Sequence, residues 1–145
     1  MASVMSAMSI TSLMAMALAM ASLQAPTSMR TLDKGLDSQI EMPRQVAVRT
    51  AAEWQALWTI HGGERARPPV DFGKEMVVGV FLGSRPTAGF SVEIVGVREE
   101  GGALIVQYRE SRPAPGLVTA QVLTMPYHIV AVPRHAGDVR FERAN

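Results

Sequence analysis

Apolar residues in the middle of the chain follow two patterns that predict β-strands. Residues 76–82 are apolar on both faces apart from Gly79 and include several β-branched residues, which is typical of a strand buried on both sides. In residues 90–97, apolar and polar positions alternate. The segment 83–89 between them has a glycine at each end and a proline inside. We therefore expect a central antiparallel pair of strands joined by a stiff loop with an arginine at its tip.

The same alternation predicts further strands on both sides of this pair. Residues 45–49 and 103–110 alternate clearly, and residues 138–142 form a last short strand before the end of the chain. A long apolar stretch, 118–132, is interrupted by Pro126. Because a proline cannot donate to a strand ladder, we expect a bulge or an edge position there.

One segment has helical periodicity. Thr50 and Glu53 form a capping box, and two glycines follow His61, so the helix is expected over residues 51–61. Its apolar stripe predicts a face that packs on a sheet, although two tryptophans on one face also fit a ligand platform. At the helix end, His61 is expected to favour its charged form and to be structural. The stripe consists of Trp54, Leu57, Trp58 and His61.

These elements predict an α+β fold, a mostly antiparallel β meander or sandwich with one helix packed on it, over residues 44–145. Residues 26–43 are polar without a clear period and are interpreted as a flexible tether. No charged side chain precedes Arg30, and residues 10–23 are mostly Ala, Met, Leu and Ser. This composition, with an Ala-x-Ala exit at residues 19–21, predicts a signal peptide over residues 1–25 and an exported protein, periplasmic or extracellular. An uncleaved membrane anchor and a misplaced start codon remain alternatives.

Charge and composition argue against several functions. The 14 basic and 13 acidic side chains nearly balance, so no basic surface for nucleic acid is expected. There is no cysteine, and no nucleophile elbow, zinc-protease motif or phosphate-binding loop occurs. The sequence therefore predicts no cofactor, no metal site and no enzyme.

Histidine chemistry leaves one enzymatic alternative. No two of His61, His128 and His135 share a metal-ligand spacing. His128 beside Glu110 or Asp71 would make an acid–base pair, which defines the alternative of a small hydrolase. A hydrogen-bonded structural histidine competes with it. Because Tyr127 and His128 point to opposite faces of a strand, we expect at most one of them in the core.

Two loops have nearly the same sequence. Residues 84–90 read Ser-Arg-Pro-Thr-Ala-Gly-Phe and residues 111–117 read Ser-Arg-Pro-Ala-Pro-Gly-Leu. Alternate connections of a meander lie at the same end, so we expect Arg85 and Arg112 on one rim of the domain. Prolines stiffen both loops, which reduces the entropy lost on binding. The alternative is that both are well-made turns with solvated arginines.

Several segments carry a family resemblance, namely residues 81–94, 108–110, 113–116, 121–130 and 132–133. Through them the chain resembles the PrcB C-terminal domain family from about residue 45 to residue 142. This family is named for an accessory lipoprotein of a secreted bacterial subtilisin-like protease complex, which binds the protease and helps it mature. The chain departs from the family pattern at residues 88–90 and at Met125, and it lacks the lipid-attachment cysteine.

The resemblance implies an exported β-rich domain. Together with the repeated loops, it favours a binding or accessory module that presents the two Arg-Pro loops to a protein partner, a secreted protease or another envelope protein. Residues 85–90 are also similar to one loop of chagasin-type cysteine protease inhibitors. A structural envelope protein is a further alternative, and membrane contact is expected only if the N-terminal segment stays uncleaved. The predicted binding residues are Arg85, Pro86, Phe90, Arg112, Pro113, Tyr127 and His128.

Overall fold

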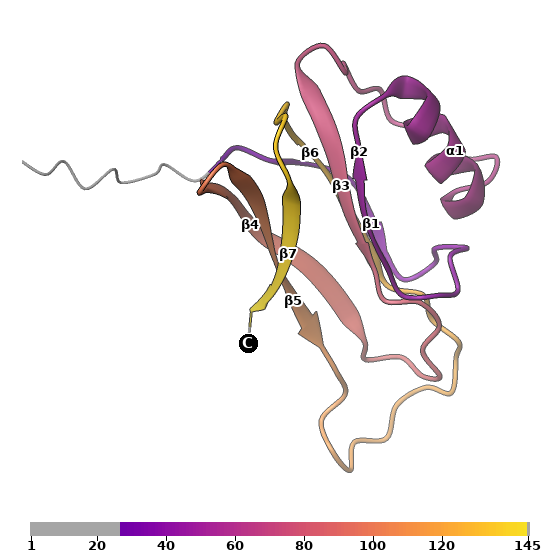
Figure 1. The fold of residues 1–145 in the computed structure, drawn as a ribbon. Coiled ribbons are helices and arrows are strands. Elements are labelled where there is room, and N and C mark those ends of the chain that lie inside the picture. The colour runs from indigo at the N-terminus through magenta and orange to yellow at the C-terminus, as the bar shows by residue number, and fades with distance from the viewer. Residues whose placement is uncertain (1–26, 145) are drawn as a thin grey trace, which may run out of the picture.

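The computed structural model describes residues 27–144, so the predicted signal peptide lies outside the described residues. Two β-sheets pack face to face, and one helix covers the outer face of the larger sheet (Figure 1). The larger sheet has the strand order β1-β6-β3-β2 and the smaller sheet the order β4-β5-β7. No helix within residues 27–144 is long and apolar enough to span a bilayer. The elements are β1 (Arg30–Gly35), β2 (Arg44–Val48), α1 (Ala51–His61), β3 (Glu75–Phe81), β4 (Ser91–Glu100), β5 (Ala103–Ser111), β6 (Tyr127–Pro133) and β7 (Val139–Ala144).

Strands β3 and β6 lie in the centre of the larger sheet and are buried on both faces. Even-numbered residues of both strands face the smaller sheet, whereas odd-numbered residues face α1. This position explains why residues 76–82 are apolar without alternation, because each face of the strand has its own core. The α+β sandwich with one packed helix is therefore confirmed.

Helix α1 has the predicted bounds. The Thr50 side chain accepts a hydrogen bond from the Glu53 amide at 3.2 Å and donates to the Glu53 carboxylate at 3.0 Å, so the two residues of the predicted capping box interact at the helix start. Trp54 and Trp58 are buried against the larger sheet. Their indole N–H groups donate to the carbonyl oxygens of Pro68 and Arg65, respectively. The packing interpretation of this stripe is confirmed, and the tryptophans offer no open ligand platform.

The structure corrects the predicted pairing of residues 76–82 with residues 90–97. Strand β3 pairs with β2 and β6, whereas β4 pairs with β5 in the other sheet. The loop 83–89 therefore crosses between the two sheets. Apolar pattern identifies a strand, but it does not say which neighbour completes its hydrogen bonds.

Two other segments differ from their predictions. Arg30–Gly35, predicted as part of a tether, forms strand β1 and pairs with β6. As an edge strand it is held by backbone hydrogen bonds along one side and needs no apolar run. The stretch 118–132 forms a strand only from Tyr127 onward, so Pro126 precedes β6 and lies neither at a bulge nor in an edge strand. Leu117, Val118 and Leu123 are instead exposed in the long connection between β5 and β6.

Candidate functional site

The two Arg-Pro loops lie against each other at one end of the sandwich. Gly89 of the first loop adopts φ 95° and contacts Pro113 of the second. A Cβ atom at Gly89 would lie 2.8 Å from Cγ of Pro113, which is too close for any side chain. The loops follow β3 and β5, which belong to different sheets, so this contact joins the two layers (Figure 1).

Glu110, at the end of β5, holds the arginines of both loops. Its Oε1 atom lies 3.4 Å from Nη2 of Arg85 and 3.4 Å from Nε of Arg112. Arg143 of β7 approaches the other carboxylate oxygen at 3.5 Å. Only 9% of the Glu110 side chain is exposed. One shielded carboxylate therefore faces three guanidinium groups, which leaves this end of the molecule positively charged.

Arg85 is fixed more firmly than Arg112. Its backbone N–H donates to the Thr124 carbonyl at 2.7 Å, and its carbonyl accepts from the Thr124 amide at 2.9 Å. Its guanidinium lies over the ring of Phe90, with 5.6 Å between its central carbon and the ring centroid. The Arg85 side chain is 28% exposed, compared with 65% for Arg112. Arg112 is thus the more accessible of the two charges.

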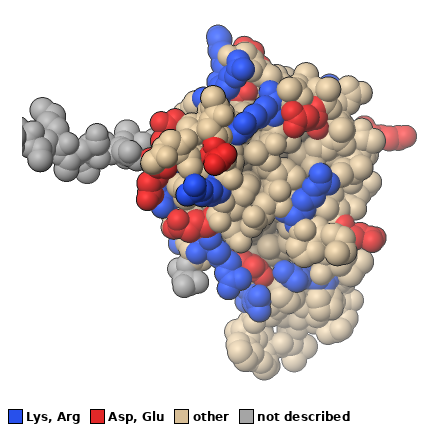
Figure 2. All heavy atoms as spheres, viewed as in Figure 1, with Lys and Arg blue, Asp and Glu red and all other residues tan. Residues whose placement is uncertain are grey.

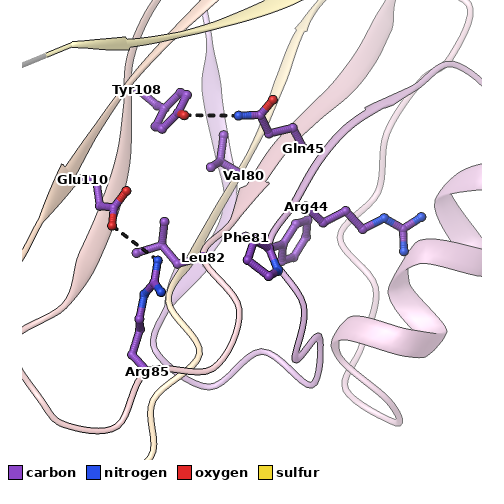
Figure 3. Close-up of a pocket in the computed structure, with 9 residues that line it drawn as sticks. Arg44, Gln45, Val80, Phe81, Leu82, Arg85, Tyr108 and Glu110 are labelled. Carbon is purple, nitrogen blue, oxygen red and sulfur yellow. Dashed lines mark hydrogen bonds and ion pairs between the residues drawn. The ribbon is translucent and has the colours of Figure 1, made fainter.

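A cleft of about 370 Å³ opens beside these arginines, between the edges of the two sheets (Figure 3). The Gln45 side-chain amide reaches across it and donates to the Tyr108 hydroxyl at 3.2 Å. Arg44, the neighbour of Gln45 in β2, points away from the cleft toward α1 (Figure 3). The cleft is lined by Pro43, Arg44, Gln45, Val80, Phe81, Leu82, Arg85, Tyr108 and Glu110.

The connection between β5 and β6 extends the surface around the Arg-Pro loops. Residues 113–125 contain no charged side chain. Val118 is 98% exposed, and Leu117 and Leu123 are also exposed. Figure 2 shows an uncharged tip at this end of the molecule, with basic side chains above it. We call this combination of Arg85, Arg112 and the exposed connection 113–125 the loop surface.

His128 does not lie at the loop surface. It is 3% exposed and projects from β6 into the space between the sheets. Its Nδ1 atom accepts a hydrogen bond from the Ile94 amide at 2.8 Å, which leaves Nε2 to carry the proton toward the Thr31 hydroxyl at 2.9 Å. Burial and the positive charge of Lys34 lower the pKa of His128 to about 4, and they outweigh the opposite effect of the Glu93 carboxylate. The predicted pairing with Glu110 or Asp71 is therefore absent, and both ring nitrogens are engaged inside the domain.

Tyr127 lies on the opposite face of β6, beneath α1. The prediction that at most one of Tyr127 and His128 is in the core is wrong, because β6 separates two buried layers. The Tyr127 hydroxyl lies 3.4 Å from the Asp37 carboxylate, and burial raises the pKa of this tyrosine. Of the predicted binding residues, the structure gathers Arg85, Pro86, Phe90, Arg112 and Pro113 at one end and places Tyr127 and His128 in the interior.

A buried hydrogen-bond network of polar side chains, not anticipated from the sequence, lies beneath the end of helix α1. His61 Nδ1 lies 2.8 Å from the Ser38 hydroxyl, and His61 Nε2 lies 2.9 Å from the Asp33 carboxylate, which also pairs with Arg65. The residue types match those of a hydrolytic triad. However, Ser38 and His61 are buried, and the Ser38 hydroxyl oxygen also accepts from the Ile40 amide. This hydrogen-bond network therefore joins β1, the β1–β2 connection and α1. Its serine, Ser38, is not accessible to a substrate.

The charge state of His61 in this network differs from its prediction. Burial lowers the pKa of His61 despite the neighbouring Asp33, so the neutral form is favoured and the expected charged form is not. Burial raises the pKa of Asp33, but hydrogen bonds from His61, Tyr127 and Arg65 outweigh that effect and lower it. A polar segment before the first predicted strand was the only sequence signal for Asp33 and Ser38.

His135, the remaining histidine, lies in a turn at the other end of the sandwich. Its Nδ1 atom is 3.1 Å from the Glu99 carboxylate, and its Nε2 atom is 3.1 Å from the Gly102 carbonyl. The three histidines thus lie in three separate places, each with its own partners. Within the described part of the chain, no group of three or more His, Cys, Asp or Glu side chains is placed to hold a metal ion.

Comparison with known proteins adds one match. The family model described as PrcB C-terminal matches residues 76–133, which confirms the resemblance over that segment. This segment runs from β3 to the end of β6 and includes both Arg-Pro loops. It indicates an accessory domain of a protease complex. No curated protein and no solved structure matches the chain.

Proposed function

Residues 76–133 of this chain belong to the PrcB C-terminal family, and on that premise we propose that the protein is an exported, non-enzymatic accessory module that presents its two Arg-Pro loops to a protein partner. A secreted protease or another envelope protein is the partner that the family role favours. The observation that carries the proposal is the shared contact of Arg85 and Arg112 with Glu110. Through it, two loops from different sheets act as one surface.

The loop surface has the composition of a protein interface. Arginine is enriched at hot spots of such interfaces, and exposed apolar side chains gain free energy when a partner removes them from water. Here Arg112 is 65% exposed, and the neighbouring connection exposes Leu117, Val118 and Leu123. The partner that fits this surface offers an apolar centre bordered by carboxylates.

The non-enzymatic part of the proposal rests on the surroundings of His128. The hydrolase alternative uses His128, whose ring nitrogens are bonded to Thr31 and Ile94. No observation at the loop surface favours that alternative, and the accessory role of the family favours a binding module.

The partner contact can be tested by pull-down from the exterior fraction of the exporting cell, with the full chain as bait. Arg112→Ala should weaken capture of the partner by about 30-fold, which corresponds to a hot-spot loss of about 2 kcal/mol. Leu123→Ser should weaken it as well. Arg140→Ala provides the matched control, since Arg140 is exposed near the start of β7, away from the loops. Equal capture by all of these variants would contradict the proposal.

Export has its own test. If residues 1–25 are a signal peptide, the exterior protein should begin at about Ser22 or Pro26 by the Ala-x-Ala rule. N-terminal sequencing of protein recovered outside the cell decides this. An intact Met1 on protein found only inside the cell would contradict export without affecting the pull-down.

A further inference from the structure

The free edge of β2 differs from the other sheet edges. β1 and β4 each contain a register shift, and β7 carries charged residues along its length. Bulges and charges are the devices by which proteins prevent further strands from adding to an edge. β2 pairs with β3 in unbroken register over its five residues and has one charged side chain, at its first position. Among the edge strands of residues 27–144, β2 is therefore the one without such protection.

The direction of the β3 backbone groups follows from its pairing with β6. In an antiparallel ladder, the N–H and C=O of one residue point to the same side, and successive residues alternate. At one end of the ladder the Leu82 amide donates to the Pro126 carbonyl, and at the other the Arg134 amide donates to the Lys74 carbonyl. Even-numbered residues of β3 therefore point toward β6, and odd-numbered residues point toward β2.

The same alternation identifies the outward groups of β2. Val46 is paired with Gly79 and Val48 with Val77, both odd-numbered residues of β3, so these valines direct their backbone groups inward. Gln45 and Ala47 direct theirs outward. The outer edge of β2 thus offers the N–H and C=O of two residues to an added strand.

Cavities flank this edge on both sides. On the α1 side a groove of about 540 Å³ is lined by all five residues of β2 and by Leu57 and Ile60 of the helix. Because successive side chains of β2 point to opposite faces, a groove that touches all five runs along the backbone edge itself. On the other side lies the cleft of about 370 Å³ that contains Gln45 and Tyr108.

The two cavities differ in chemistry. The wall toward α1 is apolar apart from Glu53, with Val46 and Leu57 buried and Ile60 46% exposed. At one end of this groove stands Arg44, an exposed side chain without an ion pair to any residue between 27 and 144. A strand added to β2 would place alternate side chains in the two cavities, about 4.8 Å from β2.

We propose that the free edge of β2 binds an extended segment of a partner protein by strand addition. The segment places apolar side chains in the groove between β2 and α1 and a carboxylate beside Arg44. Alternate side chains of the segment enter the cleft beside Tyr108. Backbone hydrogen bonds to Gln45 and Ala47 supply affinity, and the two cavities supply specificity.

This inference does not depend on the loop surface, whose Arg112 and connection 113–125 lie at the end of the sandwich; Arg85 alone also lines the cleft beside Tyr108. The variants that test the loop surface and those that test the β2 edge are also separate. Loss of partner capture in Arg112→Ala with normal peptide binding would support the loop surface alone. Peptide binding that fails only in β2 variants supports strand addition alone.

The experiment uses a displayed library of random nine-residue peptides, selected against the full chain. The expected consensus alternates apolar and polar residues and includes an acidic residue near one end. A synthetic peptide of the consensus is then methylated at one backbone amide at a time. Methylation at every second position should weaken binding at least tenfold, because only alternate amides of an added strand face β2.

Protein variants supply the matching half of the test. Ala47→Pro removes an outward N–H without breaking a bond to β3 and should weaken binding at least tenfold, whereas Ala47→Ser keeps the N–H and should bind as the parent does. Fluorescence of the buried Trp54 and Trp58 reports whether each variant is folded. Ile60→Lys changes an exposed groove position and should also weaken peptide binding, which provides a second protein test.

Several results would overturn the proposal. They are the selection of no peptide, methylation effects without a two-residue period, and unchanged binding by both Ala47→Pro and Ile60→Lys. Selected peptides that match residues 1–26 of this chain would assign the edge to its own N-terminal segment. Self-association in sedimentation that Ala47→Pro abolishes would assign it to a second copy.

Discussion

Arg85 and Glu110 form an ion pair that joins the two layers of the sandwich, with 3.4 Å between Nη2 and Oε1. Arg85 belongs to the loop after β3 in the larger sheet, and Glu110 belongs to β5 in the smaller sheet. Arg112 and Arg143 share the same carboxylate. The repeated arginine loops therefore depend on an acidic residue that lies outside the repeat.

Removing this carboxylate should cost stability. Glu110→Ala leaves its arginines without their common partner in a half-buried place and should lower the free energy of unfolding by about 1–2 kcal/mol, reduced from the buried-pair value by the exposure of the arginines. Urea denaturation measures the change. Glu64→Gln, at an exposed loop position, should stay within about 0.5 kcal/mol of the parent. Equal stabilities of the two variants would show that Glu110 does not hold the loops.

Substitution of Gly89 should separate a packing cost from a backbone cost. Gly89→Ala places a Cβ 2.8 Å from Pro113 at φ 95°, so both costs apply. Gly101→Ala meets no atom within 4 Å and at φ 58° carries only the backbone cost, about 1 kcal/mol. Thermal unfolding should therefore rank Gly89→Ala as the less stable variant by at least about 1 kcal/mol. The reverse order would mean that the two Arg-Pro loops do not depend on this contact.

His128 should make stability depend on pH. Its pKa falls from 6.5 to about 4 on folding, so the contribution of its neutral form is complete above pH 6.5 and is lost as the pH falls toward 4. The shift corresponds to about 3 kcal/mol of unfolding free energy over that interval. Urea denaturation at several pH values should show this slope, to which His61 adds in the same direction because its pKa is also lowered. In His128→Gln the slope should be shallower, and a slope equal to that of the parent would contradict the buried neutral histidine.

The helix–sheet core should depend on Trp58. This side chain is 5% exposed and packs beside Trp54, with ring centroids 5.5 Å apart. Trp58→Ala should lower the free energy of unfolding by about 3–5 kcal/mol, the range for emptying a large aromatic site. Gln55→Ala, on the exposed side of the same helix, should change it by less than about 0.5 kcal/mol. Near-parent melting of Trp58→Ala would restore the platform interpretation.

Part of the candidate site could be predicted from the sequence. The repeated Ser-Arg-Pro pattern and an assumed meander predicted that Arg85 and Arg112 lie at the same end. The structure brings them to one carboxylate, although β3 and β4 are not paired as that meander required. Glu110 was considered only as a partner for His128. It holds the arginines because β5 ends beside the loop that leaves β3, a neighbourhood that depends on how the sheets stack. His128 shows the opposite case, since its chemistry suggested a site and its surroundings engage both ring nitrogens.

By itself, the sequence determined the local elements. Side-chain periodicity and the Thr50–Glu53 capping box are properties of neighbouring residues, so helix α1 and most strands could be located from them. Only the tertiary structure decided that β3 and β4 belong to different sheets, that polar β1 pairs with β6, and that β2 keeps a free edge. These features depend on hydrogen bonds and contacts between residues far apart in the chain. A strand's own pattern shows which of its faces is buried, but not which strand lies beside it.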